Sequence, residues 1–145
     1  MWYYNFEMDK SPITIETEIK APIQKVWKYW NEPSHIEKWA FAAEDWEASG
    51  AENDLRVGGT FKTTMSAKDK SASFDFGGVY NSVIENELIE YDMDDSRHVS
   101  VKFSQTADGT KIIQTFDPEN ENPEELQKSG WQSILNNFKN YAENN

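Results

Sequence analysis

The 145-residue chain carries 26 acidic and 14 basic residues, giving a formal net charge of −12 at pH 7. That charge repels phosphate backbones and anionic lipid, and the Lys and Arg residues are scattered, so we expect neither nucleic-acid nor membrane binding. The absence of cysteine excludes disulfides, thiolate nucleophiles and Cys-ligated zinc, and it suits a cytoplasmic location.

The N-terminal segment has none of the features of a secretion signal, because it contains no basic region followed by an apolar run. We interpret residues 1–11 as an N-terminal extension. Met8 is a candidate start, which would leave residues 1–7 upstream of the natural chain. Residues 12–145 are predicted to form a single domain.

A strand and two short helices come first. Residues 13–19 (ITIETEI) alternate between apolar and polar side chains, as in a strand with one wet face. From Pro22 the period changes to that of a helix of about three turns. A shorter helix is predicted over residues 34–39, with His35 and Trp39 one turn apart on the same side.

Strand-like alternation dominates the middle of the chain, interrupted by turn sequences such as Asp108-Gly109. Tight turns between successive strands predict an antiparallel meander. Gly77-Gly78 inside a strand predicts a bulge. The predicted strands are 44–48, 59–67, 72–84, 87–93, 97–105 and 110–117.

The C-terminal segment has the clearest helical pattern, over residues 122–142. Asn122 is the expected N-cap, and Pro123 suits the first helical position. An apolar stripe predicts that this helix packs into the concave side of the sheet. The stripe consists of Leu126, Trp131, Ile134, Leu135, Phe138 and Tyr141.

The order of these elements resembles the helix-grip plan of the Bet v 1-like and START-related superfamily, an α+β fold. Particular motifs are similar to those of the activator of Hsp90 ATPase homologue 1-like family. They are Lys20-Ala21-Pro22 with Val26-Trp27, the stretch around Trp39, residues 54–59 (DLRVGG), Phe74-Asp75-Phe76, Gly109-Thr110-Lys111 and Gly130-Trp131. The resemblance covers residues 12–142. It implies a single-domain member with a cavity between the sheet and the long helix, and it raises the possibility of a chaperone partner and of a role in stress response.

Four of the six tryptophans fall within residues 26–46, and by this analogy three of them border the cavity instead of filling a core. Trp30, Trp39 and Trp46 would form its wall, with Trp131, Leu135 and Phe138 as its lid. For any single aromatic residue, an ordinary core position is the alternative. The remaining expected lining residues are His35, Phe61, Met65, Phe76, Gln114 and Phe116.

Two polar residues are candidates for orienting a ligand. Gln114 alternates with Ile112 and Phe116, so its amide needs a partner, which is either a ligand or a backbone group or water. His35 can donate or accept a proton near neutral pH, unless it is an ordinary half-buried histidine.

No metal site, cofactor or catalytic constellation is predicted. The chain has only two histidines, at unrelated positions. Asp92, Asp94 and Asp95 lack the glycine and glutamate of a calcium loop and are typical of a turn. Asp54 and Arg56 are expected to form a surface ion pair.

We therefore predict a protein that binds a small apolar ligand without catalysis. One alternative is a module that regulates an Hsp90-type ATPase. Against it, this chain and such a chaperone are both acidic, so electrostatic attraction does not favour their association. The resemblance also implies that, in the eukaryotic co-chaperones, a separate N-terminal domain contacts Hsp90. We expect no room for such a domain in this chain. The other alternative is an enzyme of the cyclase or hydrolase kind that uses His35 or a cavity acid.

Overall fold

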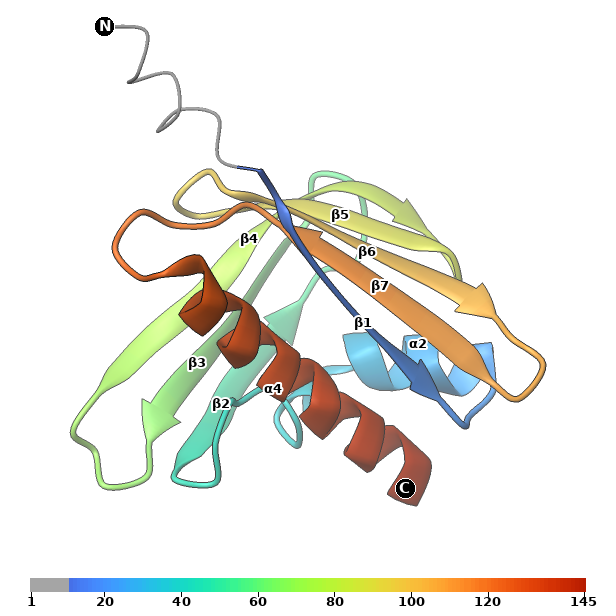
Figure 1. Ribbon diagram of the computed structural model, residues 1–145, viewed down its shortest axis with the longest axis horizontal. Helices are drawn as coiled ribbons and strands as arrows, with labels where there is room; N and C mark the ends of the chain where they lie inside the picture. The colour runs from blue at the N-terminus through green and yellow to red at the C-terminus, as the bar shows by residue number, and fades with distance from the viewer. Residues whose placement is uncertain (1–10) are drawn as a thin grey trace, which may run out of the picture.

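Seven antiparallel strands form one strongly curved sheet in the computed structural model, which describes residues 11–145 (Figure 1). The spatial order is β1-β7-β6-β5-β4-β3-β2, so consecutive strands from β2 to β7 are neighbours and the predicted meander is confirmed. The strands are β1 (Ile13–Ile19), β2 (Trp46–Asn53), β3 (Thr60–Ala67), β4 (Ser73–Ile84), β5 (Leu88–Met93), β6 (His98–Gln105) and β7 (Thr110–Phe116).

The first strand pairs with the last, in a register that sets Ile15 opposite Gln114. Where β1 passes into the helices, the Thr110 hydroxyl donates a hydrogen bond of 2.8 Å to the Ala21 carbonyl. Gly109 lies beside it, and a Cβ there would come within 2.1 Å of the Ile19 carbonyl oxygen. Only glycine therefore lets the β6–β7 turn approach the end of β1 this closely.

Two features of the sheet differ from the sequence-based predictions. Gly77-Gly78 is not a bulge, because both residues pair regularly with β3. A Cβ on Gly78 would lie 2.3 Å from the Asp92 carbonyl, so this glycine permits close strand approach instead. The register shifts lie elsewhere, between Tyr80 and Ser82 in β4 and between Ser49 and Glu52 in β2. Through this irregularity β2 continues to Asn53, past its predicted end at residue 48.

Three helices complete the described chain: α2 (Ile23–Asn31), α3 (Pro33–Ile36) and α4 (Glu124–Asn144). The prediction of Asn122 as the cap of α4 was wrong, because Pro123 occupies that position and no side chain caps the helix. The backbone of Asn122 is bonded to other groups. Its N–H donates to Glu119 Oε1 at 2.7 Å, and its carbonyl accepts from Gln127 Nε2 at 2.8 Å.

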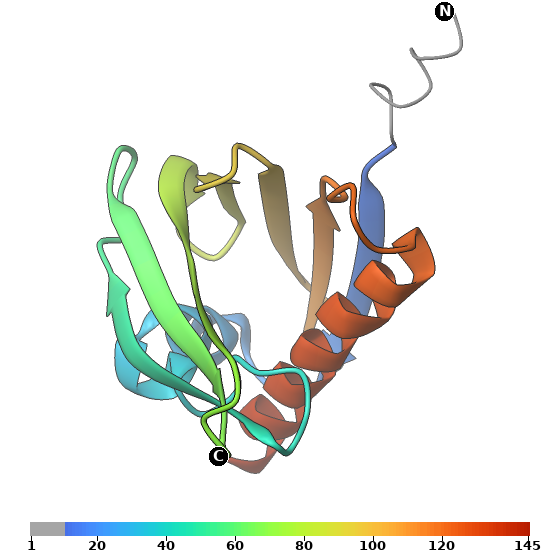
Figure 2. The same ribbon diagram turned by 90° about the vertical axis from the view of Figure 1, so that its left-hand side faces the viewer.

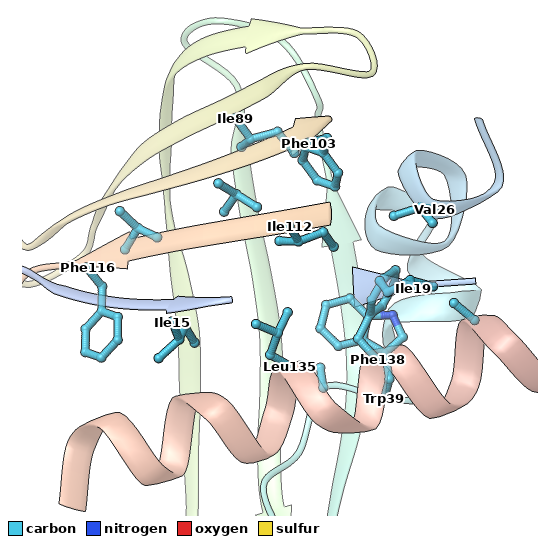
Figure 3. Packing of buried hydrophobic residues seen from close by; sticks show 14 of the residues in the cluster. Ile15, Ile19, Val26, Trp39, Ile89, Phe103, Ile112, Phe116, Leu135 and Phe138 are labelled. Carbon is cyan, nitrogen blue, oxygen red and sulfur yellow. The ribbon is translucent and has the colours of Figure 1, made fainter. Parts of the chain in front are cut away.

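The core lies between α4 and the concave face of the sheet, nearest to β1 (Figures 2 and 3). Leu135 and Phe138 point from α4 into this core and are almost completely buried. Leu126 is 60% exposed and does not belong to the buried stripe, because it lies in the first turn of α4, which presents Gln127 inward instead.

The predicted N-terminal extension lies almost entirely outside the described residues, so its boundary stays a prediction, as does the single domain over residues 12–145. Within residues 11–145, no helix combines the length and apolar character needed to span a bilayer.

Candidate ligand-binding site

A cavity of about 550 Å³ lies between α4, the two short helices and the concave face of the sheet. Its volume falls within the range of small-molecule sites, about 300–1,000 Å³. In the described part of the chain, seven aromatic residues line it: Trp30, Trp39, Phe61, Phe74, Phe76, Tyr91 and Trp131.

Trp30 and Trp39 form the end of the cavity next to the short helices. Their ring centroids lie 4.8 Å apart, and each ring packs edge-on against Phe138, at 4.9 Å in both cases. The Trp39 indole N–H donates to the Tyr29 carbonyl at 3.0 Å, which fixes the ring orientation. Phe138 thus supports these two rings from behind.

Trp131 on α4 lines the cavity where it approaches β7. Its indole stacks on Phe116 with centroids 4.0 Å apart and planes inclined by 7°. Phe76 on β4 contacts the same indole edge-on at 5.9 Å. Stacked and edge-on contacts of this kind hold a ring in place, so this wall is largely preformed.

Three polar side chains in the cavity wall have no hydrogen-bond partner among residues 11–145. The Gln114 amide is 6% exposed, and Thr63 and Tyr91 are similarly buried. No side-chain nitrogen or oxygen that is sealed from solvent lacks a partner in this part of the chain. The unpaired groups of these three residues therefore open onto the cavity. Burial raises the pKa of Tyr91, with a further rise from Tyr80, so its hydroxyl remains a neutral donor.

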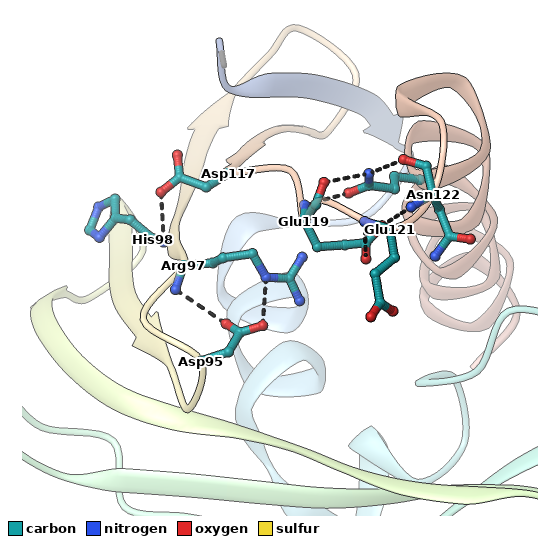
Figure 4. A network of polar contacts seen from close by, with 8 residues as sticks. Asp95, Arg97, His98, Asp117, Glu119, Glu121 and Asn122 are labelled. Carbon is teal, nitrogen blue, oxygen red and sulfur yellow. Dashed lines mark hydrogen bonds and ion pairs between the residues drawn. The ribbon is translucent and has the colours of Figure 1, made fainter. Parts of the chain in front are cut away.

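The other end of the cavity is polar and lies between the β5–β6 turn and the loop before α4 (Figure 4). Arg97 extends from the turn toward the loop that carries Glu119, and its Nε donates to Asp95 Oδ2 at 2.8 Å. The Glu119 carboxylate accepts from the N–H groups of Asn122 and Glu121. The bond from Asn122 is the main reason that the pKa of Glu119 is lowered, so this carboxylate stays ionised at neutral pH.

The structure brings seven of the predicted site residues together around the cavity. Gln114 is buried as its alternation indicated, and the aromatic residues come from the region of the short helices, from the sheet and from α4. The seven are Trp30, Trp39, Phe61, Met65, Phe76, Gln114 and Trp131.

His35 and Trp46 lie away from the cavity. Helix α3 ends at Ile36, so the spacing from His35 to Trp39 is not that of one helix. His35 instead stacks on Tyr29 at 4.0 Å, and its Nδ1 lies 2.6 Å from the Tyr141 hydroxyl. Trp46 begins β2 and packs near Phe74, with centroids 5.9 Å apart.

Phe116, Leu135 and Phe138 are core residues and do not line the cavity. Trp131 covers Phe116, while Leu135 and Phe138 fill the space between α4 and the sheet. The residue of α4 that does line the cavity beside Trp131 is Ile134. The apolar stripe of α4 is therefore wider than the predicted lid. Trp131 and Ile134 on one edge line the cavity, and Leu135 and Phe138 on the other edge pack in the core.

Several lining residues were missed by sequence reasoning. Thr63 alternates with Phe61 and Met65, and that pattern was sufficient to find it. Asp94, Asp95 and Arg97 carried no such signal, because their place depends on how the β5–β6 turn meets the loop before α4.

Two further polar features predicted from the sequence are a surface ion pair and a turn. Asp54 and Arg56 form the expected exposed ion pair at 3.0 Å. The residues between β5 and β6 form a turn, as expected. Within the described chain, no group of three His, Asp or Glu side chains has the arrangement of a metal site.

We compared the chain with models of protein families and with solved structures, and both comparisons found similar proteins. Residues 20–143 match the model of the activator of Hsp90 ATPase homolog 1-like protein family. The chain belongs to this family.

Solved structures of similar proteins agree with that membership. An AHSA1-like protein from Aeromonas hydrophila is 43% identical and superimposes with a TM-score of 0.86, over 91% of this chain and 92% of its own. A protein from Cytophaga hutchinsonii is 59% identical, with a TM-score of 0.80 and 92% of both chains covered. A Chromobacterium violaceum protein that is 23% identical shares the fold, with a TM-score of 0.82 over 92% of this chain and 99% of its own.

No curated protein matches the sequence. As a member of the activator of Hsp90 ATPase homologue 1-like family, the chain has the helix-grip α+β fold of the Bet v 1-like superfamily. The predicted family and fold class are therefore confirmed.

Proposed function

We propose that the protein binds a small, mainly apolar molecule in the cavity and does not transform it. The observation that carries this proposal is Gln114, an almost fully buried amide that opens onto an aromatic-walled cavity and has no hydrogen-bond partner among residues 11–145. Because the amide opens onto the cavity, water can pair with it when no ligand is bound. A molecule that displaces this water must supply a hydrogen bond in its place, since an unpaired buried amide costs about 1–3 kcal/mol. The proposed setting is the cytoplasm, with no cofactor.

Binding would rest mainly on apolar contact. Burial of apolar surface contributes about 25 cal/mol per Å², and Trp30, Trp39 and Trp131 offer large flat surfaces to a ligand. Because Phe138 and Phe116 hold these rings in place, little ordering cost accompanies binding. Gln114, Thr63 and Tyr91 then orient the ligand through its hydrogen-bonding groups.

The absence of catalysis is part of the proposal and rests on the chemistry of the lining. A hydrolase or cyclase needs a proton-transfer group beside the reacting atoms. His35 is bonded to Tyr141 outside the cavity. The Asp75 carboxylate accepts from Thr64 on the outer face of the sheet, and Asp95 and Glu119 lie at the polar end beside Arg97.

The test is a titration with a chemically broad panel of apolar molecules, followed by native mass spectrometry. Ile134→Trp adds volume in the lining and is expected to weaken binding at least tenfold, about 1.4 kcal/mol. Leu126→Trp is the matched control, because it introduces the same ring at an exposed position of the same helix. Binding that is unchanged by Ile134→Trp would place the site elsewhere, and absence of binding across the panel would contradict the proposal.

Regulation of an Hsp90-type ATPase is the second candidate, favoured by the family description alone. An interaction with an acidic chaperone would have to overcome the formal charge of −12, which opposes association over distance. We therefore rank it below ligand binding.

A further inference from the structure

The ionised groups at the polar end of the cavity are already engaged by protein partners. Arg97 Nε donates to Asp95 Oδ2 at 2.8 Å. The Glu119 carboxylate accepts from two backbone N–H groups, and the charge of Arg97 helps to lower the pKa of this carboxyl. Burying a charge without a partner costs far more than burying a neutral polar group. The polar end therefore favours an uncharged molecule.

Two other acids near the cavity turn their carboxylates to the outer face of the sheet. Asp75 accepts from the Thr64 hydroxyl at 2.7 Å. Asp94 Oδ2 lies beside Gly77, where it would be 3.2 Å from an added Cβ. Neither carboxylate provides a charge for a ligand inside the cavity.

The Tyr91 hydroxyl is a hydrogen-bond donor that has no acceptor among residues 11–145. Tyr91 is 7% exposed, and its hydroxyl opens onto the cavity. Burial raises the pKa of Tyr91, so the hydroxyl keeps its proton at neutral pH. The charge of Arg97 opposes this rise, which places the guanidinium near the hydroxyl. A guanidinium offers only donors, so an acceptor for Tyr91 has to come from the bound molecule or from water.

The neighbouring Tyr80 provides an internal comparison. It lies directly opposite Tyr91 in the pairing of β4 with β5, and it is 6% exposed. Its hydroxyl donates to Asn53 Oδ1, and it does not line the cavity. Of these two paired tyrosines, the one whose hydroxyl faces the cavity is the one without an acceptor in the described chain.

Gln114 projects from the same concave face as Tyr91, on the other side of β6. Val99 pairs with Tyr91, and Val101 pairs with Gln114. Because Val99 and Val101 are alternate residues of one strand, Tyr91 and Gln114 occupy neighbouring inward positions of the sheet. A ligand that accepts from Tyr91 can therefore also reach the Gln114 amide, which both donates and accepts.

From these observations we propose that the natural ligand is an uncharged molecule with an apolar body and a carbonyl-type oxygen, and that the Tyr91 hydroxyl donates to this oxygen. Ketones, esters and amides share this chemistry. The inference rests on the proposed function and narrows it, and it makes Tyr91 a residue that determines specificity. The apolar body would lie against Trp30, Trp39 and Trp131, which line the same cavity.

The experiment uses four planar probes that share a naphthalene ring and differ in one substituent of similar shape. They are acetylnaphthalene, isopropenylnaphthalene, naphthoate and naphthamidinium, all substituted at the same ring carbon. Equilibrium dialysis of the full chain measures the affinity of each probe. The ketone is expected to bind about tenfold or more tightly than either ion, because neither ion finds a free opposite charge.

The contribution of Tyr91 is measured as the ratio of ketone affinity to alkene affinity within one protein. Tyr91→Phe is expected to lower this ratio at least about fivefold, because it removes the donor and keeps the ring. Tyr80→Phe is the matched control, since it removes a hydroxyl that is bonded to Asn53, and it should leave the ratio unchanged. Because both probes meet the same folded fraction, a loss of stability does not alter the ratio.

The possible outcomes separate this inference from the proposed function. An unchanged ratio in Tyr91→Phe, or an equal fall in both variants, would overturn the hydrogen bond from Tyr91 and leave cavity binding intact. Tightest binding of naphthoate or naphthamidinium would overturn the uncharged ligand in the same way. No saturable binding of any probe would count against the cavity as a binding site and would overturn both proposals.

Discussion

His35 Nδ1 lies 2.6 Å from the Tyr141 hydroxyl and joins α3 to the last turn of α4. The Tyr29 ring stacks on the same imidazole, and its hydroxyl donates to the Asn145 carbonyl at 2.9 Å. These contacts hold the C-terminal end of α4 against the two short helices. The opposite end of α4 borders the polar part of the cavity, where the Gln127 amide is bonded to the backbone of Glu119 and Asn122.

Tyr141→Phe is expected to lower the free energy of unfolding by about 1 kcal/mol, because it removes this hydrogen bond without removing the ring. Urea unfolding measures the change. Tyr29→Phe is the control and should have a smaller effect, since its bond to Asn145 is exposed. A Tyr141→Phe protein as stable as wild type would mean that the bond does not hold α4 in place.

Phe138→Ala is expected to destabilise the protein by about 3–5 kcal/mol, because the ring is completely buried and supports Trp30 and Trp39. Leu126→Ala on the same helix should change stability by no more than about 0.5 kcal/mol, since Leu126 is exposed. Denaturant unfolding of the two variants side by side makes the comparison. Equal effects would contradict the packing of α4 on the sheet.

Gln114→Leu is expected to raise the stability of the ligand-free protein by about 1 kcal/mol, because a largely buried amide in an aromatic-walled cavity is replaced by an apolar group of similar volume. The same variant should bind polar ligands less tightly. Thermal and urea unfolding without ligand provide the measurement. A loss of stability would show that the amide already has a partner in the folded protein.

His98 is expected to make stability depend on pH. Its hydrogen bond to Asp92 raises the pKa of His98 above 6.5, and Glu90 adds to the effect. Because the folded state binds this proton more tightly, the stabilisation is fully present below pH 6.5 and is lost as the pH rises through the raised value. The effect should be small, since the His98 side chain is 45% exposed and is screened by solvent.

Urea unfolding between pH 5.5 and 8.5 checks this expectation, with His98→Gln as the comparison. The difference in stability between wild type and variant should be largest at the acidic end. A difference that is constant over the whole range would rule out His98 as its source.

No stimulation of ATP hydrolysis by an Hsp90-type chaperone is expected at physiological salt, because the charge of −12 disfavours association with an acidic partner. A coupled ATPase assay with increasing protein concentration measures the turnover. A saturable increase at micromolar protein would reverse our ranking of the two candidate functions.

Local periodicity was sufficient to predict most of the fold. Strict alternation in residues 13–19 and the stripe containing Leu135 and Phe138 identified the elements and their inward faces. The cavity wall was predictable where a residue shared a face with known neighbours, as Gln114 does with Ile112 and Phe116.

Some predicted residues were misplaced because periodicity within one element does not show how that element packs against others. Whether Leu135 or Ile134 reaches the cavity depends on which side of α4 faces β1, because adjacent residues of a helix point about 100° apart. His35 was misplaced because α3 stops after four residues. The polar end of the cavity was missed because Arg97 and Glu119 meet only when two loops come together in space.

The irregular strand β2 also bears on how the protein avoids self-association. Among residues 11–145 it has a neighbouring strand on only one side. Apart from the Ala51 N–H, which donates to Glu37, its outer edge therefore offers backbone N–H and C=O groups to any extended chain. The register shift between Ser49 and Glu52, with Gly50 at a φ of +60°, breaks the even spacing that such pairing needs. Glu47 and Glu52 place negative charge along the same strand. Two copies meeting edge to edge would therefore face mismatched hydrogen bonds and like charges, which keeps a long exposed edge from seeding aggregation.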